Sequence, residues 1–267
     1  MKLLIIPDIH CRKFWRNTID KNIAFVDKVI FLGDYLDPYP KEIEANPDLM
    51  EVSSSNDSQK ALDMLNDIVS LKKNEPDKYI LLLGNHTCSY IWPKFSAGSR
   101  TDHRNWEKYH KFFSQNLEYF NLVWIEENNI FSHAGISEGW ANEFLYACMK
   151  YDEGAELEKD SVVFETARVL KDTPLKNFNK YYIEAISDIS YWRNGDSQFG
   201  SCEWADIREH FYIFENEVIP NGEDGIYQVF GHTQLKQDPL INDKFACLDC
   251  RRGFIFNTIT HECEDCL

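Results

Sequence analysis

Short apolar runs that stop at polar loops recur along the first part of the chain. Three of them, Lys2–Ile6, Val26–Leu32 and Tyr79–Leu83, have the length of a buried parallel strand. Between the second and the third, apolar residues recur at helical spacing over Ser58–Lys73, which predicts a helix that Asp57 or Ser58 caps. Strand, helix and strand in this order predict a sheet covered by helices.

The later part of the chain predicts a hairpin, a helical segment and three closing strands. The hairpin strands are Leu122–Ile125 and Asn129–Ser132, on either side of a polar turn. The helical pattern extends over about residues 138–189, with a break at Asp172–Pro174. The closing strands are expected at Tyr227–Phe230, Phe245–Leu248 and Gly253–Ile259. Because nothing marks a domain boundary, we predict a single domain over residues 1–267, with the helical segment as an insertion.

One stretch between the second strand and the first helix lacks both kinds of periodicity. Pro38–Ser55 is rich in proline, asparagine, serine and acidic residues. Such a composition over this length predicts a long mobile loop.

The composition limits the class of protein. With 267 residues, of which 43% are hydrophobic, the chain can form a sizeable core. Its formal charge of −16 repels nucleic acid and anionic membranes, and this disfavours a nucleic-acid partner. The first apolar run is too short for a signal peptide, and no window approaches the roughly 20 apolar residues of a membrane span. We therefore predict a cytoplasmic protein with no membrane partner.

Five of the predicted strands end in loops that hold metal-ligand residue types. The loops are Asp8-Ile9-His10, Gly33-Asp34-Tyr35-Leu36-Asp37, Gly84-Asn85-His86, Ser132-His133-Ala134-Gly135 and Gly231-His232-Thr233. Each loop alone is a weak signal, because an Asp-x-His is more often a turn and a buried histidine more often a core residue. All five share one context, however, and ligands gather at the carboxyl ends of strands in α/β sheets.

The residue types in these loops suit transition metals. Carboxylate oxygen, amide oxygen and imidazole nitrogen together favour Mn, Fe or Zn. A carboxylate such as Asp34 can bridge two ions about 3.5–4 Å apart, the spacing of two-metal sites that act on phosphorus.

The set D-x-H, G-D-x-x-D, G-N-H, H-A-G and G-H-T resembles the calcineurin-like metallophosphoesterase superfamily. It is most similar to the branch that holds the protein serine/threonine phosphatases and the symmetrical diadenosine tetraphosphatases. The resemblance spans residues 8 to about 250. It implies an α/β fold in which a two-sheet β-sandwich is flanked by helices.

The resemblance also implies a role for each motif residue. The first metal ion would be held by Asp8, His10 and Asp34. The second would be held by Asp34, Asn85, His133 and His232. The general acid would be His86, oriented by Asp37. The nucleophile would be a water that bridges the two ions, Mn, Fe or Zn, with its pKa lowered towards neutrality.

Two positions depart from the protein phosphatases. There the second Asp of G-D-x-x-D is followed by Arg and Gly, whereas Asp37 is followed by Pro38 and Tyr39. The G-N-H motif usually continues with Glu or Asp, but Thr87 stands here. The arginine that clamps phosphate in those enzymes is therefore absent, and a close protein-phosphatase mode of substrate binding is in doubt.

Two other arginines are candidates for binding the substrate phosphate. Arg193 lies in Tyr191-Trp192-Arg193-Asn194-Gly195, where the phosphatases carry a Trp-centred loop, and Arg100 follows the G-N-H loop. A guanidinium can bind two phosphate oxygens at once. Arg12, two residues after His10, is a third and weaker candidate. For the first two the alternative is a surface salt bridge, an ordinary role in so acidic a chain.

Two C-x-x-C pairs stand near the C-terminus. They are formed by Cys247 with Cys250 and by Cys263 with Cys266. A hairpin over Arg251–Glu262 could bring the pairs together as an additional structural zinc site. Against this, cysteines three apart on a strand point to opposite faces. The simpler alternative is ordinary strand residues and thiols, and a redox disulfide is a third interpretation.

Aromatic residues gather after the G-N-H loop. Trp106, Tyr109 and Phe113 share one helical face. Aromatic residues in this position could stack on a nucleotide base, but at helical spacing they more often belong to a core. We favour the core interpretation.

The predicted function is metal-dependent hydrolysis of a phosphate monoester. The substrate would be phosphorylated, as a small molecule, a nucleotide or a phosphoprotein. The alternative within enzymes is hydrolysis of a dinucleoside polyphosphate or a nucleotide phosphodiester. The alternative outside enzymes is an inactive binding scaffold, but scaffolds of this kind lose ligands or the acid, and all seven positions are intact here.

Overall fold

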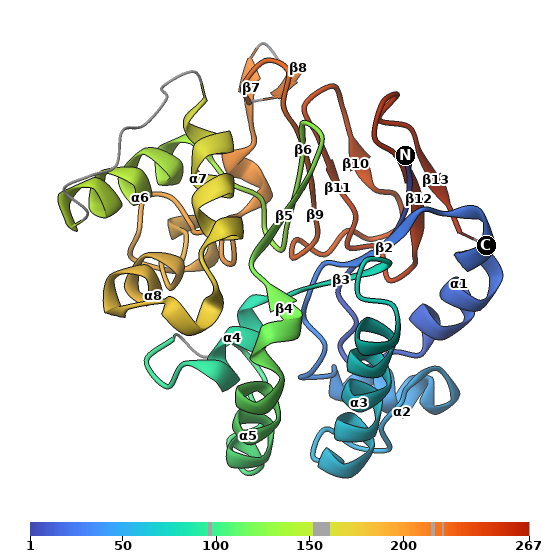
Figure 1. The fold of residues 1–267 in the computed structure, drawn as a ribbon. Helices are drawn as coiled ribbons and strands as arrows, with labels where there is room; N and C mark the ends of the chain where they lie inside the picture. The colour runs from blue at the N-terminus through green and yellow to red at the C-terminus, as the bar shows by residue number, and fades with distance from the viewer. Residues whose placement is uncertain (96–97, 152–160, 215–216, 221, 267) are drawn as a thin grey trace. The chain divides into compact units, whose positions relative to one another are not determined.

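The chain divides into two units, each built around a mixed sheet (Figure 1). One unit comprises Met1–Phe120 with Arg251–Leu267, and the other Asn121–Cys250. The computed structural model describes residues 1–95, 98–151, 161–214, 217–220 and 222–266. The predicted α/β class, with two mixed sheets and flanking helices, is confirmed.

The sheet of the first unit has the strand order β13-β12-β1-β2-β3-β4. Its strands are β1 (Lys2–Ile6), β2 (Lys28–Phe31), β3 (Tyr79–Leu82), β4 (Phe120–Asn121), β12 (Phe254–Asn257) and β13 (Cys263–Asp265). The strands β1, β2 and β3 are parallel neighbours, with Leu4 opposite Val29 and Val29 opposite Tyr79. Because parallel neighbours end at the same edge, the loops after these three strands lie together.

Helices cover this sheet. The helical elements of the unit are α1 (Phe14–Asn22), η1 (Ile23–Phe25), α2 (Pro40–Ala45), η2 (Pro47–Leu49), α3 (Ser58–Asn74), α4 (Asn85–Ile91), α5 (Trp106–Asn116) and η3 (Leu117–Tyr119). The helix α3 agrees with the prediction, and the Asp57 side chain caps it by accepting from the backbone N–H of Lys60. Its apolar face packs towards β3 and α5. On α5, Tyr109 and Phe113 are buried, so the core interpretation is right for these aromatic residues.

The prediction of a loop over Pro38–Ser55 is wrong in part. Residues Pro40–Ala45 form α2, and Pro47–Leu49 form a 3-10 turn. Both elements carry proline in the first turn, where its fixed φ suits a helix and its missing N–H is not needed. Pro40 and Pro47 therefore begin helical elements.

The sheet of the second unit has the strand order β10-β11-β9-β6-β5. Its strands are β5 (Val123–Glu126), β6 (Asn129–Ser132), β9 (Tyr227–Phe230), β10 (Leu240–Ile241) and β11 (Phe245–Cys247). The predicted hairpin is present as the antiparallel pair β5 and β6. The strands β6, β9 and β11 run parallel, so the loops after β6 and β9 share an edge. A separate pair is formed by β7 (Phe211–Phe214) and β8 (Glu217–Pro220).

The second unit also holds three helices among its described residues. The helical elements are α6 (Glu138–Tyr151), α7 (Val162–Asp172), η4 (Leu175–Asn177), α8 (Lys180–Ile186), η5 (Tyr191–Arg193) and η6 (Ile207–Glu209). Ser161 caps α7, which ends at the predicted break. Residues 152–160 of the segment predicted as helical lie outside the described residues.

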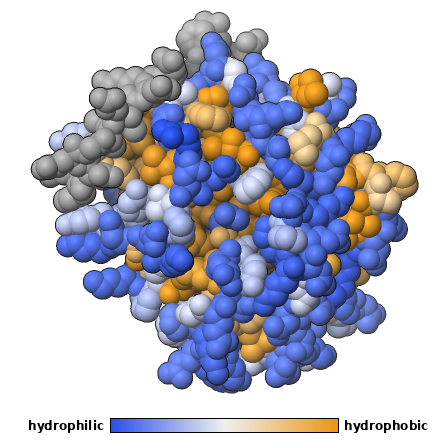
Figure 2. Space-filling model, viewed as in Figure 1, coloured by the Kyte–Doolittle hydropathy of each residue, from blue (hydrophilic) through white to orange (hydrophobic). Residues whose placement is uncertain are grey.

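Hydrophilic side chains cover most of the face in Figure 2, and hydrophobic ones show between them. Large exposed hydrophobic residues include Phe25, Ile259, Tyr191 and Trp192. Among the described residues, no helix has the length and apolar character needed to cross a membrane.

Candidate metal centre

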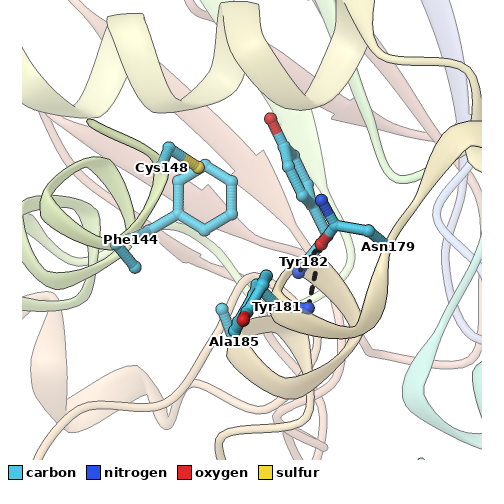
Figure 3. A pocket seen from close by; sticks show the side chains of 7 residues that line it. Phe144, Cys148, Asn179, Tyr181, Tyr182 and Ala185 are labelled. Atoms are coloured by element: carbon cyan, nitrogen blue, oxygen red, sulfur yellow. Dashed lines mark hydrogen bonds between the residues drawn. The ribbon is translucent and has the colours of Figure 1, made fainter. Parts of the chain in front are cut away.

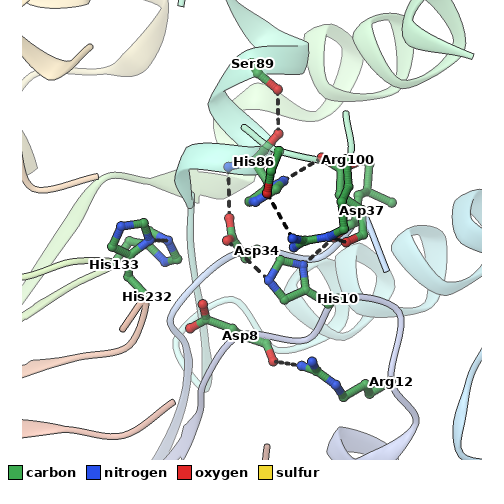
Figure 4. A network of polar contacts seen from close by, with 12 residues as sticks. Asp8, His10, Arg12, Asp34, Asp37, His86, Ser89, Arg100, His133 and His232 are labelled. Atoms are coloured by element: carbon green, nitrogen blue, oxygen red, sulfur yellow. Dashed lines mark hydrogen bonds and ion pairs between the residues drawn. The ribbon is translucent and has the colours of Figure 1, made fainter. Parts of the chain in front are cut away.

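In the first unit, the predicted ligands lie at the ends of three adjacent strands. Asp8 follows β1, Asp34 follows β2, and Asn85 begins α4 directly after β3. All three are buried. The backbone N–H of His10 donates to the carbonyl oxygen of Asp34 at 2.7 Å, which ties the first two loops together. Figure 4 shows the side chains of these loops side by side.

Several of the motif residues have a left-handed backbone. The φ angles are 45° at His10, 46° at Asp34, 57° at Asp37 and 60° at His232. Residues other than glycine rarely adopt this conformation, and where they do the strain is often part of a functional site. The four residues come from the loops that the metal-ligand pattern singled out.

The approach of the second and third loops depends on Gly84. A Cβ atom at this position would lie 2.3 Å from Asp34 Oδ1. The backbone of Gly84 is extended, so the glycine is needed for space and not for an unusual φ. Without a side chain here, the Asp34 carboxylate reaches the start of α4, where it accepts from the backbone N–H of His86 at 3.0 Å.

His10 is held as a neutral imidazole with one nitrogen available. Its Nδ1 lies 2.7 Å from the carbonyl oxygen of Leu36, which can only accept, so Nδ1 carries the proton. Burial lowers the pKa of His10 well below its usual range, although Asp34 pulls in the opposite direction. A neutral ring with an N–H fixed by a carbonyl is the form in which histidine binds metals, here through Nε2.

The donor atoms of this unit fit a transition-metal ion. His10 Nε2 lies 3.6 Å from Asp34 Oδ2. Two ligands at about 2.0–2.2 Å from one ion can be separated by such a distance. His10, Asp34 and His86 form a group whose ligand atoms lie within 4.8 Å of one another. The residues present therefore fit the metal that the sequence pattern predicts.

His86 is paired with Asp37. Its Nδ1 lies 2.7 Å from Asp37 Oδ2, and both side chains are buried. An ionised carboxylate only accepts, so Nδ1 donates and Nε2 points elsewhere. The second oxygen of Asp37 accepts from the hydroxyl of Tyr90. This geometry suits an imidazole that gives and takes protons at Nε2.

In the second unit, the two predicted ligands meet at the ends of β6 and β9. His133 Nε2 and His232 Nδ1 are 3.1 Å apart. At this distance one ring can donate to the other, or both can coordinate one ion at about 2.0–2.1 Å. The backbone N–H of Gly231 donates to the carbonyl oxygen of His133 at 2.8 Å, so the two loops are joined.

Arg193 lies beside the His232 loop. Its Nε is 2.9 Å from Asp206 Oδ2, and its terminal nitrogen donates to the Thr233 hydroxyl at 2.5 Å. Asp206 also binds Arg208, whose guanidinium stacks on Trp192 at 4.5 Å from the ring centroid. Arg193 is thus part of an ion pair and is fixed next to a predicted ligand.

Arg100 lies beside the His86 and Asp37 pair. Its Nε donates to the carbonyl oxygen of Asp37 at 3.1 Å, and its guanidinium stacks on Tyr39 at 3.7 Å from the ring centroid. Arg12, in contrast, is buried and binds Glu42 through two nitrogens, at 2.8 and 3.3 Å. This pairing occupies the guanidinium of Arg12 and weakens its case as a phosphate ligand.

The four C-terminal cysteines belong to both units. Cys247 ends β11, and both it and Cys250 are buried in the second unit. Cys263 begins β13 in the first unit, where the predicted hairpin places it opposite Phe256. Burial and neighbouring acidic residues raise the pKa of Cys266 to about 11. Zinc binding by these cysteines remains a prediction.

A pocket in the second unit lies between residues of α6 and α8 (Figure 3). Its lining includes Phe144, Cys148 and Tyr182. Asn179 caps α8 there by accepting from the backbone N–H groups of Tyr181 and Tyr182. The lining residues come from none of the five motif loops, so the pocket is separate from the predicted chemistry.

The sequence analysis did not identify the residues that orient the predicted site residues. The Tyr90 hydroxyl donates to the Asp37 carboxylate, and Asp206 forms an ion pair with Arg193. The position of Tyr90 four residues after His86, on the same helix face, is a signal that could have identified it. Asp206 offers no comparable signal, because a single acidic residue in an acidic chain predicts nothing.

Most of the chain matches a known protein family. Residues 1–236 match the family described as calcineurin-like phosphoesterase. The chain belongs to this family. The resemblance inferred from the five motifs is therefore confirmed. A comparison with curated proteins finds no sequence match.

Solved structures share the calcineurin-like fold. A cold-active protein tyrosine phosphatase is 13% identical, with a TM-score of 0.52 over 99% of this chain and 78% of the other. A protein serine/threonine phosphatase from Saccharomyces cerevisiae is 11% identical, with a TM-score of 0.49 over 100% of this chain and 80% of the other. The likeness to the tyrosine phosphatase supports the fold.

Proposed function

We propose that the chain hydrolyses phosphate monoesters with two bound transition-metal ions, Mn, Fe or Zn. The observation that carries the proposal is the buried group of His10, Asp34 and His86, with His86 paired to Asp37, in a member of a phosphoesterase family. When bound, two such ions lower the pKa of a shared water and neutralise charge on the phosphate.

The metal ligands follow from the family's pattern applied to the motifs of this chain. The first ion would be held by Asp8, His10 and Asp34. The second would be held by Asp34, Asn85, His133 and His232. The neutral state of His10 and the fixed proton on its Nδ1 support its part in this assignment.

His86 acts as the general acid. The Asp37 carboxylate, 2.7 Å from Nδ1, orients the ring. The Nε2–H then gives its proton to the oxygen of the leaving alcohol as the ester bond breaks. The backbone N–H of His86 donates to the Asp34 carboxylate at 3.0 Å, which fixes the start of α4, and with it the His86 ring, beside the predicted ligands.

Arg100 and Arg193 bind the substrate phosphate. Each is fixed along one edge, Arg100 by the Asp37 carbonyl and Tyr39, and Arg193 by Asp206 and Thr233. A guanidinium fixed in this way can present its remaining N–H groups to an anion with little further loss of freedom.

The test compares p-nitrophenyl phosphate with bis-p-nitrophenyl phosphate, each in EDTA and with added Mn²⁺. We expect Mn²⁺-dependent turnover of the monoester and little of the diester. Preference for the diester would replace the proposal with nucleotide phosphodiester or dinucleoside polyphosphate hydrolysis. If neither compound is turned over while metal is bound, the proposed activity is refuted and the chain is better explained as a binding scaffold.

A further inference from the structure

The Asp37 carboxylate is held from two sides. One oxygen, Oδ2, lies 2.7 Å from Nδ1 of His86, and the other accepts from the hydroxyl of Tyr90. Asp37 is 3% exposed and Tyr90 is fully buried, so water does not compete for either bond. A carboxylate bound at both oxygens cannot rotate about its Cβ–Cγ bond without breaking one of them.

The direction of the Tyr90 hydroxyl is itself fixed. The backbone N–H of Asp102 donates to the Tyr90 oxygen at 2.8 Å, which leaves the hydroxyl proton for Asp37. Burial, together with the nearby Asp37 charge, raises the pKa of Tyr90 above its usual range. Tyr90 therefore stays a phenol and a donor at every pH at which the enzyme would work.

The segment that supplies this N–H also lies against His86. A Cβ atom on Gly98 would be 2.8 Å from Cε1 of the His86 ring, so the main chain passes directly beside the imidazole. Within the same segment, Asp102 is held by Asn105, which donates to its carboxylate from the backbone and the side chain. Tyr90 thus connects Asp37 to a second, independently anchored part of the unit.

We propose that Tyr90 is a positioning residue for the hydrolysis: its hydroxyl fixes the Asp37 carboxylate, and through Asp37 it aims the Nε2–H of His86 at the leaving oxygen. This inference rests on the proposed function. Without the hydroxyl, one buried Asp37 oxygen has lost its donor, and the carboxylate can turn away from the His86 ring. The rate of proton transfer then falls more than the affinity for the substrate.

The test is Tyr90→Phe with two monoesters of different leaving group. Departure of p-nitrophenolate needs little protonation, whereas departure of an alkoxide from glycerol 2-phosphate depends on the acid. We expect kcat on glycerol 2-phosphate to fall about tenfold or more, part of the roughly 10²–10⁴ that a general acid contributes. For p-nitrophenyl phosphate kcat should change by less than about threefold, with KM and bound metal unchanged.

Tyr109→Phe is the matched control. Tyr109 is a buried tyrosine whose ring lies 5.0 Å from the Tyr90 ring, so its variant reports any general loss of packing. We expect it to behave as the parent on both substrates. An equal loss on both substrates in Tyr90→Phe, or a similar loss in Tyr109→Phe, would mean a structural role and overturn the proposal.

A double variant tests the connection through Asp37. If Tyr90 acts only through Asp37, adding Tyr90→Phe to Asp37→Asn should cost no further activity on glycerol 2-phosphate. Additive losses would contradict the inference. Failure of the proposed function is distinguishable, because the parent itself would then lack metal-dependent turnover of either monoester.

Discussion

The ring of His86 binds Asp37 through Nδ1, and its Nε2 is the atom proposed to donate the proton. Replacing His86 should therefore lower turnover without lowering metal binding. His86→Asn should retain bound metal while turnover of glycerol 2-phosphate, whose alkoxide leaving group needs a proton, falls by roughly two or more orders of magnitude, the contribution of a general acid. Metal per chain by elemental analysis, together with kcat, measures both. His103→Asn, at an exposed histidine, is the control and should leave both unchanged.

The same variant separates two roles for His86. Its ring also lies in the group of ligand atoms with His10 and Asp34. Loss of metal in His86→Asn, alongside the loss of turnover, would make His86 a ligand and contradict its assignment as the acid.

At the residue scale, the sequence identifies the groups that carry chemistry but not those that orient them. Asp37 and His86 could be named because each sits in a recognisable motif at a strand end. Asp206 could not be named, and Tyr90 only through its spacing from His86, since their roles depend on contacts with Arg193 and Asp37 that no motif records. Hydrophobic periodicity carries no information on such contacts.

At the scale of elements, the ends of β2 and β3 must approach closely for Asp34 to reach the start of α4. Gly84→Ala would place a methyl group 2.3 Å from Asp34 Oδ1. We expect weaker metal binding and a loss of about 1–3 kcal/mol in the free energy of unfolding, as for overpacked sites. Urea unfolding in EDTA and metal titration measure the two effects separately.

Gly222→Ala is the control for this variant. A Cβ atom there would meet no closer atom than Lys244 Cβ at 3.4 Å, an ordinary contact. Gly84→Ala with the stability and metal affinity of the parent would show that the close approach of the two loops is not needed.

Long apolar runs made the central strands predictable, while short elements were not. Apart from the lysine that begins β1 and the lysine that begins β2, the strands β1, β2, β3 and β9 are buried, and their sequences are mostly apolar. The strands β4, β10 and β13 have two or three residues, too few to show a period. The helix α2 was not predicted because its one proline, Pro40, is typical of a loop, although it begins the helix.

At the scale of the whole molecule, a buried histidine should link unfolding to pH. His210 packs against Phe230 and Phe245, with ring centroids 4.7 and 5.9 Å away. Burial lowers its pKa to about 4, while the Ala134 backbone and Asp206 pull the other way. The unfolded chain binds this proton near pH 6.5 and the folded chain does not, so acid favours unfolding.

The contribution of His210 to stability should therefore be complete above about pH 6.5 and decline as the pH falls towards 4. Over that window the free energy of unfolding should fall by about 3 kcal/mol from this residue alone. Urea unfolding of the parent and of His210→Gln between pH 7.5 and 4.5 isolates the effect. Parallel pH profiles for the two proteins would contradict it.

The scale of the whole molecule is also where family membership added most. The five loops are spread from residue 8 to residue 233, and only their common pattern identified them as one set. The fold class and the family followed from that pattern. Neither depends on the acidic composition, which only disfavoured nucleic acid as a partner.

The central claim is that two metal ions per chain support phosphate-ester hydrolysis. The most direct measurement adds Mn²⁺ stepwise to metal-free protein and follows bound Mn²⁺ per chain together with turnover of p-nitrophenyl phosphate. The account predicts that turnover rises with occupancy and reaches its plateau at two ions per chain. Full turnover at one ion, or none with both bound, would contradict it.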